Sequence, residues 1–496
     1  MRKFWTLKVA FYKFWILAFL VFLTNFGCAQ SKNDLPNIVI ILADDLGYGD
    51  LQCYNPESLI PTSNLDKLAS EGIRLTDAYC PVAVCSPSRY ALMTGQYPWK
   101  SWRKTGVMRN YEPSMIDSSL LTLPEMLQKS GYHTYGLGKW HLGTTFPTFD
   151  GGKPVGYGQF KAEKNGANID LSKPVTDGPL DHGFDDWYGF SCASECWILE
   201  NNMVTGAIKH DFYNINSARN TRHLERYSLD EYTSVLTKKA INFLQEKSHS
   251  KKPFFLYFSP YVPHIPISVS EEFKGKTKAG SYGDYVHELD YYIGQILDAL
   301  DSLGLEENTI VLFASDNGSQ FEVTSDQMDL SSAANNPENP GIKDLEYKHL
   351  PNGVLRGTKW TVFEGGVRTP LIVRWPGKIE AGEVSNSIFG LMDVFATIGS
   401  IIDFPLSIEE MKDSKNLSGV LTGEEGHQRN DIIVRASGAV YGYRLNNWKY
   451  IPENEEYNIQ EALFNLENDP GEQRNLIDKE HVVANSMRQK LEEIRK

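Results

Sequence analysis

Four short apolar runs, each bounded by turn-forming residues, constrain the fold of this chain more than any other feature. They are short enough to be buried strands and lie at residues 38–43, 254–258, 310–314 and 371–373. Helical stretches at 64–70 and 285–300 lie between them, the first with Thr62 as a capping residue and Gly72 just past its end. Apolar strands that alternate with helices are typical of α/β proteins. The sequence therefore predicts an α/β fold with a large, mostly parallel or mixed sheet flanked by helices.

The composition fits such a fold and argues against several other classes. The chain has 496 residues, of which 41% are hydrophobic and 23% charged, unlike disordered, collagen-like or polytopic membrane chains. Its formal net charge is -14 at pH 7, so it lacks the positive surface that nucleic-acid-binding proteins need. We therefore expect no nucleic-acid partner, and any anionic ligand must be held by local positive charge.

Polar residues follow three of the apolar runs at the point where each ends. The first run ends in Asp44 and Asp45, the second in Ser259 and Pro260 with His264 a few residues on, and the third in Asp316, Asn317 and Gly318. In open α/β sheets ligands bind outside the carboxyl ends of the strands, so these side chains should converge. Carboxylate and amide oxygens suit Ca²⁺ or Mg²⁺. The alternative for each short motif alone is an ordinary turn.

A cysteine opens another predicted helix. Cys85 is followed by Pro87 in the first turn and Arg89 one turn on, and Gly95 lies beyond the end. A cysteine at a helix N-terminus beside an arginine lies in positive potential, which predicts an activated thiol or an anion site. A buried structural cysteine is the alternative.

The segment Cys85-Ser86-Pro87-Ser88-Arg89, continued to Gly95, resembles the signature of the formylglycine-dependent sulfatases, within the alkaline-phosphatase-like superfamily. Further similar segments occur in order along the chain, at 37–49, 138–143, 182–185, 316–318, 355–359, 364–368, 463–466, 469–472 and 475–476. The resemblance thus covers about residues 37–476, and its implied fold is the alkaline-phosphatase-like α/β fold.

This resemblance implies an activity, a cofactor and a role for each site residue. The activity is hydrolysis of sulfate esters, after a formylglycine-generating or sulfatase-maturating enzyme has oxidised Cys85 to formylglycine. The implied Ca²⁺ ligands are Asp44, Asp45, Asp316, Asn317 and the formylglycine made from Cys85. The implied catalytic residues are Arg89 and Lys139, which would hold the formylglycine oxygens, His141 as a base, and His264 and Lys359, which would grip the sulfate and protonate the leaving oxygen.

The spacing around two of these residues is compatible with those roles. If Lys139 and His141 lie on an extended segment, they project to the same side and can both face the site. His264 is flanked by Pro263 and Pro266, which stiffen its loop.

The first 28 residues have the pattern of an export signal. Four basic residues, Arg2, Lys3, Lys8 and Lys13, precede an apolar run at 14–23. This run is shorter than the roughly 20 residues that a bilayer span needs, but fits the core of a signal peptide. Cys28 follows directly after Gly27, as at the lipid-attachment site of bacterial lipoproteins; simple secretion is the alternative. We therefore expect residues 1–28 to be a signal peptide of lipoprotein type, the protein to be exported to the periplasm or cell surface, and a lipid anchor at Cys28 to be its one membrane contact.

The rest of the chain divides into two predicted domains. A sulfatase catalytic domain is expected at 33–404, and a smaller α+β domain at 405–496, with an antiparallel sheet and a helix at 480–495. Polar loops at 144–183 and 319–353 are interpreted as the rim of the site, with surface insertions as the alternative. Four further cysteines, whose pairing stays open between core packing and one local bridge, are Cys53, Cys80, Cys192 and Cys196.

The predicted function is hydrolysis of sulfate esters on a carbohydrate. An export signal with a sulfatase signature favours a sulfated polysaccharide or its oligosaccharides, such as ulvan, carrageenan or a glycosaminoglycan. Trp102 and Trp197 could stack on sugar rings, although most aromatic residues pack in cores. Two alternatives remain: a phosphate or phosphonate ester hydrolase of the same superfamily, and a non-catalytic glycan-binding lipoprotein whose Cys85 stays a thiol.

Overall fold

The apolar run at 38–43 becomes β1 (Asn37–Ala43), a central strand of an 11-stranded sheet in the computed structural model. The structure describes residues 35–160, 165–192, 195, 197–209, 224–323, 328–330, 349–424, 426 and 428–495. The other three runs become β9 (Phe254–Ser259), β10 (Thr309–Ser315) and β13 (Leu371–Arg374) of the same sheet. All four strands are buried along their whole length, which explains why both of their faces are apolar.

Seven further strands complete this sheet: β2 (Ile73–Leu75), β4 (His133–Lys139), β5 (Asp186–Phe190), β6 (Trp197–Glu200), β7 (Met203–Lys209), β8 (Glu225–Ser228) and β14 (Glu383–Ser385). The strand order is β14-β2-β13-β10-β1-β9-β4-β5-β6-β7-β8. Neighbours from β10 to β5 run parallel, whereas β13 and β6 pair antiparallel with the two ends of this block. The predicted mostly parallel or mixed sheet is confirmed, and the carboxyl ends of β1, β4, β9 and β10 share one edge.

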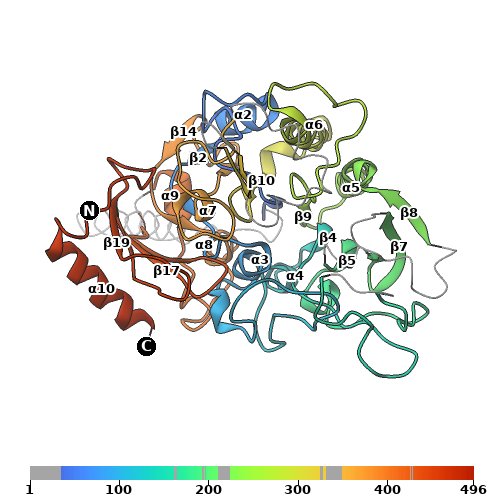
Figure 1. Ribbon diagram of the computed structural model, residues 1–496. Coiled ribbons are helices and arrows are strands. Elements are labelled where there is room, and N and C mark those ends of the chain that lie inside the picture. The colour runs from blue at the N-terminus through green and yellow to red at the C-terminus, as the bar shows by residue number, and fades with distance from the viewer. Residues whose placement is uncertain are drawn as a thin grey trace, which may run out of the picture. The chain divides into compact units, whose positions relative to one another are not determined.

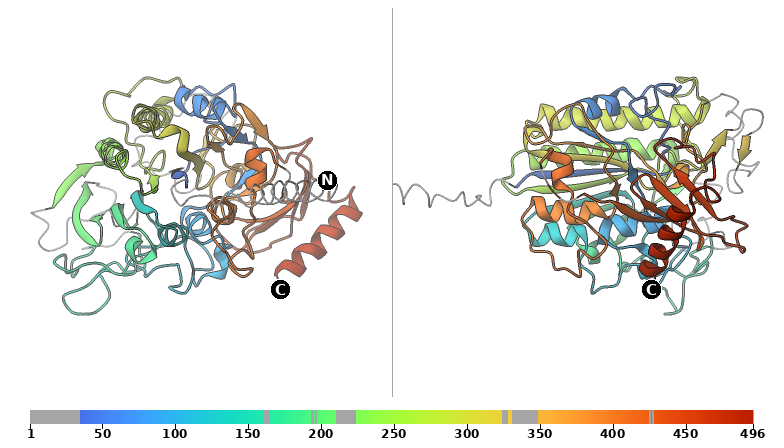
Figure 2. Two further views of the ribbon diagram at one scale, coloured as in Figure 1. Left: turned by 180° about the vertical axis from the view of Figure 1, so that it is seen from behind. Right: turned by 90° about the vertical axis from the view of Figure 1, so that its left-hand side faces the viewer.

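Helices cover both faces of the sheet, as Figures 1 and 2 show. One face carries α2 (Ser63–Ser70), α5 (Leu229–Lys247) and α6 (Gly280–Ser302), and the other carries α3 (Cys85–Thr94), α4 (Leu123–Lys129) and α8 (Asp393–Ile401). Shorter helical segments are α7 (Glu364–Val367), α9 (Ser418–Thr422), and the 3₁₀ turns η1 (Pro98–Lys100), η2 (Pro179–His182) and η4 (Glu306–Asn308). The helices predicted at 64–70 and 285–300 are thus confirmed.

The start of α2 differs from the prediction in one detail. Thr62 precedes the helix, but its side chain makes no capping hydrogen bond. Asp290 of α6 accepts hydrogen bonds from the backbone N–H groups of Asn64 at 3.2 Å and Leu65 at 2.8 Å. A carboxylate from a packed neighbour therefore satisfies the free N–H groups at this helix end.

The C-terminal residues form a separate antiparallel sheet, as predicted. Its strands, in spatial order, are β16 (Asp431–Arg435), β17 (Tyr441–Leu445), β18 (Trp448–Ile451) and β19 (Ala462–Asn465). The predicted helix at 480–495 is α10 (His481–Arg495), which contacts β17 and β18 (Figure 1). Because Asn37–Lys496 form one compact unit, the boundary near residue 405 stays a prediction.

Two small two-stranded sheets complete the fold. One pairs β3 (Ala78–Tyr79) with β15 (Phe389–Gly390). The other pairs β11 (Phe321–Val323) with β12 (Met328–Leu330), so the prediction that 319–353 is loop throughout is wrong at this hairpin. Within its described residues, 144–183 forms isolated β-bridges and η2, which agrees with the predicted loop.

Several predictions lie outside the described residues. They concern the signal peptide at 1–28, the lipid anchor at Cys28 and any pairing of Cys196. Among the described cysteines, free thiols are found at Cys53, Cys80 and Cys85. No described helix has both the length and the apolar character needed to cross a membrane.

Candidate active site

The carboxyl edge of the parallel strands gathers the predicted site residues. Asp44 and Asp45 follow β1, Asp316 and Asn317 follow β10, and Lys139 is the last residue of β4. The loop after β9 supplies His264, α3 supplies Cys85 and Arg89, and Lys359 precedes α7. These are the strand ends at which ligands bind in open α/β sheets, so the predicted convergence is observed.

Arg89 is fully buried among acceptors from four parts of the chain. Its Nε donates to Oδ2 of Asp316 at 3.0 Å, and its Nη2 lies 2.9 Å from the same oxygen and 3.7 Å from Oδ1 of Asp44. Its Nη1 donates to the Lys139 carbonyl at 2.9 Å and to Oγ of Ser259 at 2.6 Å. A buried guanidinium is tolerated only when it is paired in this way. Arg89 therefore ties the ends of β1, β4, β9 and β10 together.

Two lysines pair with the two aspartates that follow β1. Nζ of Lys139 lies 2.5 Å from Oδ2 of Asp44, and Nζ of Lys359 lies 2.6 Å from Oδ2 of Asp45. Burial disfavours ionisation of Asp44, but the surrounding positive charges, Lys139 first among them, together outweigh it and hold the pKa of Asp44 well below its usual value. Burial likewise disfavours the charged form of Lys359, but the nearby acidic groups, Asp45 first among them, together outweigh it and raise the pKa of Lys359. The site therefore holds alternating charges away from water.

The thiol of Cys85 is not activated in this setting. Its side chain is the first of α3 and only 2% exposed, and Sγ lies 3.9 Å from Oδ1 of Asp45. Burial raises the pKa of Cys85 to about 12, more than the charges of Lys139 and Lys359 lower it. The predicted activated thiol is therefore wrong, because desolvation outweighs the positive potential at the helix start.

His141 does not lie on an extended segment, so the condition under which it and Lys139 would project to the same side is not met. β4 ends at Lys139, and His141 has a φ of +57°, in the left-handed region. Its backbone N–H donates to the Ser191 carbonyl at 2.7 Å, and its Nε2 lies 3.1 Å from the Met108 carbonyl. Nδ1 is buried and has no partner among the described residues. Burial, and then the charge of Lys139, lower the pKa of His141 well below its usual value, so the ring is neutral at pH 7.

The side chain of His264 is 12% exposed, more than that of Asp45, the charged group of the cluster with which it pairs. Its Nδ1 lies 2.5 Å from the Ile265 carbonyl, and its Nε2 is 3.7 Å from Oδ2 of Asp45. Its ring packs against Tyr261, with centroids 4.5 Å apart. Burial, and then the charge of Lys359, lower the pKa of His264 to about 4. The imidazole nitrogens therefore reach the site in their neutral form.

The donor set fits a hard divalent cation. One ligand atom each from Asp44, Asp45, Cys85 and His264 lie within 4.8 Å of one another. Oδ1 of Asp44 and Oδ1 of Asn317 are buried and have no hydrogen-bond donor among the described residues. Acceptors left in this state are satisfied by a cation or by water. Their oxygen chemistry suits Ca²⁺ or Mg²⁺ better than a thiolate-seeking metal.

Some residues that hold the site were not singled out from the sequence. Tyr257 contacts Nη1 of Arg89, with its hydroxyl oxygen at 3.4 Å. Met108 joins His141 to the start of α3, because its N–H donates to Oγ of Ser86 at 3.0 Å. Ser259, by contrast, is expected at the site because it is a polar residue that ends a buried strand. The Met108 contact is made by backbone atoms and leaves no signal in the side chain.

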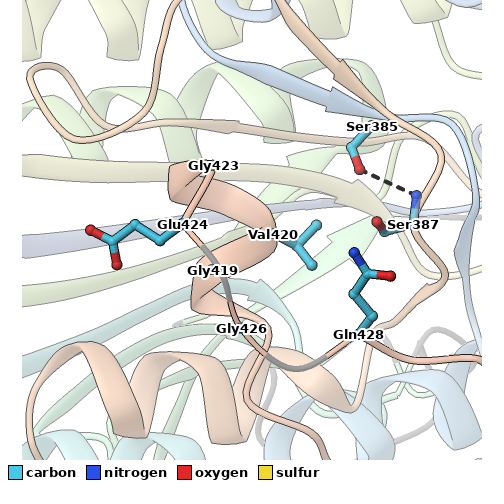
Figure 3. A pocket seen from close by; sticks show the side chains of 8 residues that line it. All are labelled: Ser385, Ser387, Gly419, Val420, Gly423, Glu424, Gly426 and Gln428. Atoms are coloured by element: carbon cyan, nitrogen blue, oxygen red, sulfur yellow. Dashed lines mark hydrogen bonds between the residues drawn. The ribbon is translucent and has the colours of Figure 1, made fainter.

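A further cavity of about 560 Å³ shares no residue with this cluster. It is shown in Figure 3, where Ser387 N–H donates to Ser385 Oγ at 3.2 Å, and its other lining residues are Gly419, Val420, Gly423, Glu424, Gly426 and Gln428. Its described lining is mostly small and uncharged apart from Glu424, so the chemistry belongs to the cluster around Cys85.

Comparison with known proteins identifies the class. The sulfatase family model matches residues 36–404, and a model for the C-terminal region of N-sulphoglucosamine sulphohydrolase matches residues 358–496. An N-acetylgalactosamine-6-O-sulfatase of Bacteroides thetaiotaomicron is 29% identical over 532 residues, covering 95% of this chain and 96% of the relative. The N-acetylgalactosamine-6-sulfatase of Mus musculus is 34% identical over 378 residues, covering 73% of this chain and 61% of the relative.

A solved structure agrees with these relatives. It comes from work on the metabolism of multiple glycosaminoglycans by Bacteroides thetaiotaomicron, and has a TM-score of 0.77 at 27% identity, covering 93% of this chain and 99% of the other. Polar and charged side chains gather at the carboxyl ends of the parallel strands. Together with these matches, this arrangement defines a hydrolase of the alkaline-phosphatase-like superfamily. Within that class, the chain belongs to the sulfatase family and is a sulfuric ester hydrolase.

Proposed function

We propose that this enzyme is an exported carbohydrate sulfatase that removes sulfate from a sulfated glycan or its oligosaccharides. The relatives named for N-acetylgalactosamine 6-sulfate support a glycosaminoglycan-type ester as the first substrate to test. The observation that carries the proposal is the set of buried cations Arg89, Lys139 and Lys359 around Cys85, in a chain of net charge -14. Such a local concentration of positive charge stabilises a sulfate group as negative charge develops on its oxygens.

Each site residue has a task in this proposal. Lys139 and Lys359 neutralise sulfate oxygens, and Arg89 fixes the strand ends from which the other groups project. His141, neutral and with a free Nδ1 among the described residues, accepts a proton at that atom. His264 and Lys359 lie together beside Asp45, where they orient the ester and return a proton to the leaving oxygen.

Two groups absent from the bare polypeptide complete the proposed site. Asp44, Asp45, Asp316, Asn317 and residue 85 would hold Ca²⁺, which supplies a Lewis acid and a template for the sulfate oxygens. Formylglycine at position 85 would supply a nucleophilic hydroxyl in its hydrated form. A thiol whose pKa is about 12 is a poor nucleophile at neutral pH, which supports the need for this conversion.

Export and maturation belong to the same proposal. The N-terminal pattern at 1–28 supports secretion to the periplasm or cell surface, with a lipid anchor at Cys28. The cell must also provide a formylglycine-generating or sulfatase-maturating enzyme as a partner, because no residue of this chain oxidises Cys85 in the proposed scheme.

Mass spectrometry of the tryptic peptide 75–89 tests the modification. This peptide contains Cys80 and Cys85, so the unmodified form takes up two equivalents of an alkylating reagent. Conversion of Cys85 lowers the mass of the peptide and leaves one alkylation site, at Cys80. Cys85→Ala serves as the matched control, with one alkylation and no turnover. Two alkylations in an enzyme that still releases sulfate would refute the formylglycine step.

Activity assays test the reaction and the metal. The matured enzyme should release sulfate from N-acetylgalactosamine 6-sulfate and far less phosphate from the matching phosphate ester; the reverse preference would favour a phosphohydrolase. Chelation with EGTA should lower both activity and melting temperature, because Asp44, Asp45 and Asp316 then repel one another without a cation. Added Ca²⁺ should restore both, and full activity after exhaustive chelation would argue against the metal.

A further inference from the structure

A long cationic stretch of chain leads out of the active site. Between Asp77 and Glu112 the sequence contains no acidic residue, and its basic residues are Arg89, Lys100, Arg103, Lys104 and Arg109. Arg89 is the buried residue of the site, and Arg109 is exposed. This segment is therefore locally positive, although the whole chain has a net charge of -14.

Met108 connects this stretch directly to the active site. Its carbonyl lies 3.1 Å from Nε2 of His141, and its N–H donates to Oγ of Ser86, the neighbour of Cys85. Met108 is fully buried, whereas the next residue, Arg109, is exposed. The chain therefore passes from the wall of the site to the surface within one residue, and Arg109 stands at the rim.

Two arginine–aromatic pairs form this rim. The guanidinium carbon of Arg103 lies 4.9 Å from the ring centroid of Trp102, and that of Arg109 lies 5.1 Å from the ring of Phe160. The two rings are unusually open for their size, with 49% of Trp102 and 44% of Phe160 exposed. By contrast, Trp197 is fully buried, so it packs in the core and is not available to stack on a sugar.

Hydrogen bonds and one ion pair hold the residues of the rim in place. Nε1 of Trp102 donates to the Ser114 carbonyl at 2.7 Å. Glu112 forms an ion pair with Arg103 and accepts a hydrogen bond from the backbone N–H of Arg109 at 2.7 Å. The guanidinium of Arg109 contacts the Gly158 carbonyl at 3.4 Å and forms no ion pair with the described residues. Its positive charge is therefore available to a ligand.

We propose that Trp102, Arg109 and Phe160 form a subsite for an anionic sugar next to the one that is desulfated. The inference rests on the proposed function and adds that the preferred substrate carries a second negative group, a uronate carboxylate or another sulfate. A guanidinium binds either group through paired hydrogen bonds, and exposed aromatic rings pack on the apolar faces of sugar rings. Continuity with His141 through Met108 places this subsite beside the reacting ester.

The test compares two substrates of the matured enzyme. One is N-acetylgalactosamine 6-sulfate as a monosaccharide, and the other is the disaccharide in which a uronic acid is linked to it. The wild type should have the higher kcat/KM for the disaccharide. Arg109→Gln should reduce the disaccharide-to-monosaccharide ratio of kcat/KM about tenfold, the loss expected for one charge-assisted hydrogen bond. Arg109→Lys, which keeps the charge but loses the planar fork, should recover part of that ratio.

A salt series and a control variant sharpen the result. The preference of the wild type for the disaccharide should shrink as NaCl rises from 50 to 500 mM, because salt screens an exposed charge. Arg109→Gln should show a flatter salt dependence. Lys412→Gln, at an exposed lysine that pairs with Glu409, should leave the ratio unchanged.

The outcomes separate this inference from the proposed function. If the wild type hydrolyses both compounds and Arg109→Gln leaves their ratio unchanged, the subsite is wrong and the sulfatase assignment stands. If the wild type prefers the monosaccharide, the subsite is also wrong. If neither compound is hydrolysed by enzyme with formylglycine at position 85, the proposed sugar is wrong and the subsite falls with it.

Discussion

Removal of the Lys449 ammonium is predicted to destabilise the fold strongly. Lys449 of β18 is fully buried between two buried carboxylates, with Nζ 2.8 Å from Oε1 of Glu364 and 2.9 Å from Oε1 of Glu472. Burial opposes ionisation of Glu364, but the charges of Lys449, Arg368 and Arg444 together outweigh it and lower the pKa of Glu364. Burial raises the pKa of Glu472 more than Lys449 lowers it. Without Lys449, both carboxylates face each other in a dry interior.

The expected loss for Lys449→Met follows from these contacts. Breaking a buried ion pair by removing one partner costs about 3–5 kcal/mol. Arg368 remains 3.5 Å from Oε2 of Glu364, and Tyr79 donates to the same oxygen at 2.7 Å. The uncompensated group is therefore chiefly Glu472, and we expect a loss near the lower bound, about 3 kcal/mol.

The loss should also depend on pH in a known direction. In Lys449→Met, burial without the ammonium raises the pKa of Glu472 further above the unfolded value, so the folded state retains a proton that the unfolded chain releases. The deficit is then largest at pH 8 and shrinks as the pH falls towards 5. A change of one pKa unit corresponds to about 1.4 kcal/mol.

Urea unfolding, followed by tryptophan fluorescence at pH 5 and pH 8, measures both effects. Lys412→Met is the matched control, since Lys412 pairs with Glu409 at 3.3 Å on the surface and its loss should cost under about 1 kcal/mol. Adding Glu472→Gln to Lys449→Met should recover part of the stability. The reasoning is refuted if Lys449→Met stays within about 1 kcal/mol of the wild type at pH 8, or if its deficit grows as the pH falls.

Two further predictions concern other buried groups. Burial raises the pKa of Glu195 to about 8, so the folded state keeps a proton that the unfolded chain loses above about pH 4.5, and stability falls as the pH rises between these values. Glu195→Gln should flatten that part of the melting-temperature profile between pH 5 and 9, and an unchanged slope would contradict this account. Thr122 caps α4 by accepting a hydrogen bond from the Glu125 N–H at 3.2 Å, and its hydroxyl donates to the His182 carbonyl at 2.7 Å. Thr122→Ala should therefore lower the free energy of unfolding by about 1–2 kcal/mol, measured with urea. An unchanged free energy would show that neither hydrogen bond contributes.

The centre of the fold could be predicted because its strands are buried on both faces. A run such as 38–43 must be apolar throughout, and this pattern is visible in the sequence without knowledge of its partners. The outer strands carry no such signal: β14 is only three residues long and largely exposed. The capping of α2 by Asp290 could not be predicted either. Asp290 lies more than two hundred residues along the chain from the helix N–H groups to which it is hydrogen-bonded.

The site residues could be named from short motifs, but their environment could not. The position of Cys85 at a helix start suggested an activated thiol, and the structure reverses that interpretation because the side chain is only 2% exposed. His141 is two residues after Lys139, yet its positive φ removes it from the strand. Burial and backbone conformation depend on the whole fold, so spacing alone does not determine them.

The glycines near Lys359 explain why distant motifs come together without side-chain contacts. A Cβ on Gly318 would lie 1.8 Å from the Gly365 carbonyl oxygen, and a Cβ on Gly365 would lie 2.1 Å from the Gly357 carbonyl oxygen. The Gly318 N–H donates to the Gly366 carbonyl at 3.1 Å. Backbone therefore packs on backbone where the loop after β10 meets α7, and a side chain on either glycine would push the two segments apart.

This contact joins the buried charges around Lys449 to the active site. Glu364 begins α7 and is held by Lys449, so the C-terminal sheet fixes the helix that packs against Gly318, next to Asn317. The Lys359 N–H donates to the Ser319 carbonyl at 3.0 Å on the other side of Gly318. The loop that carries Asp316 and Asn317 and the lysine proposed to bind sulfate are thus positioned by the same backbone contact, which gives the C-terminal sheet a role in the geometry of the proposed site.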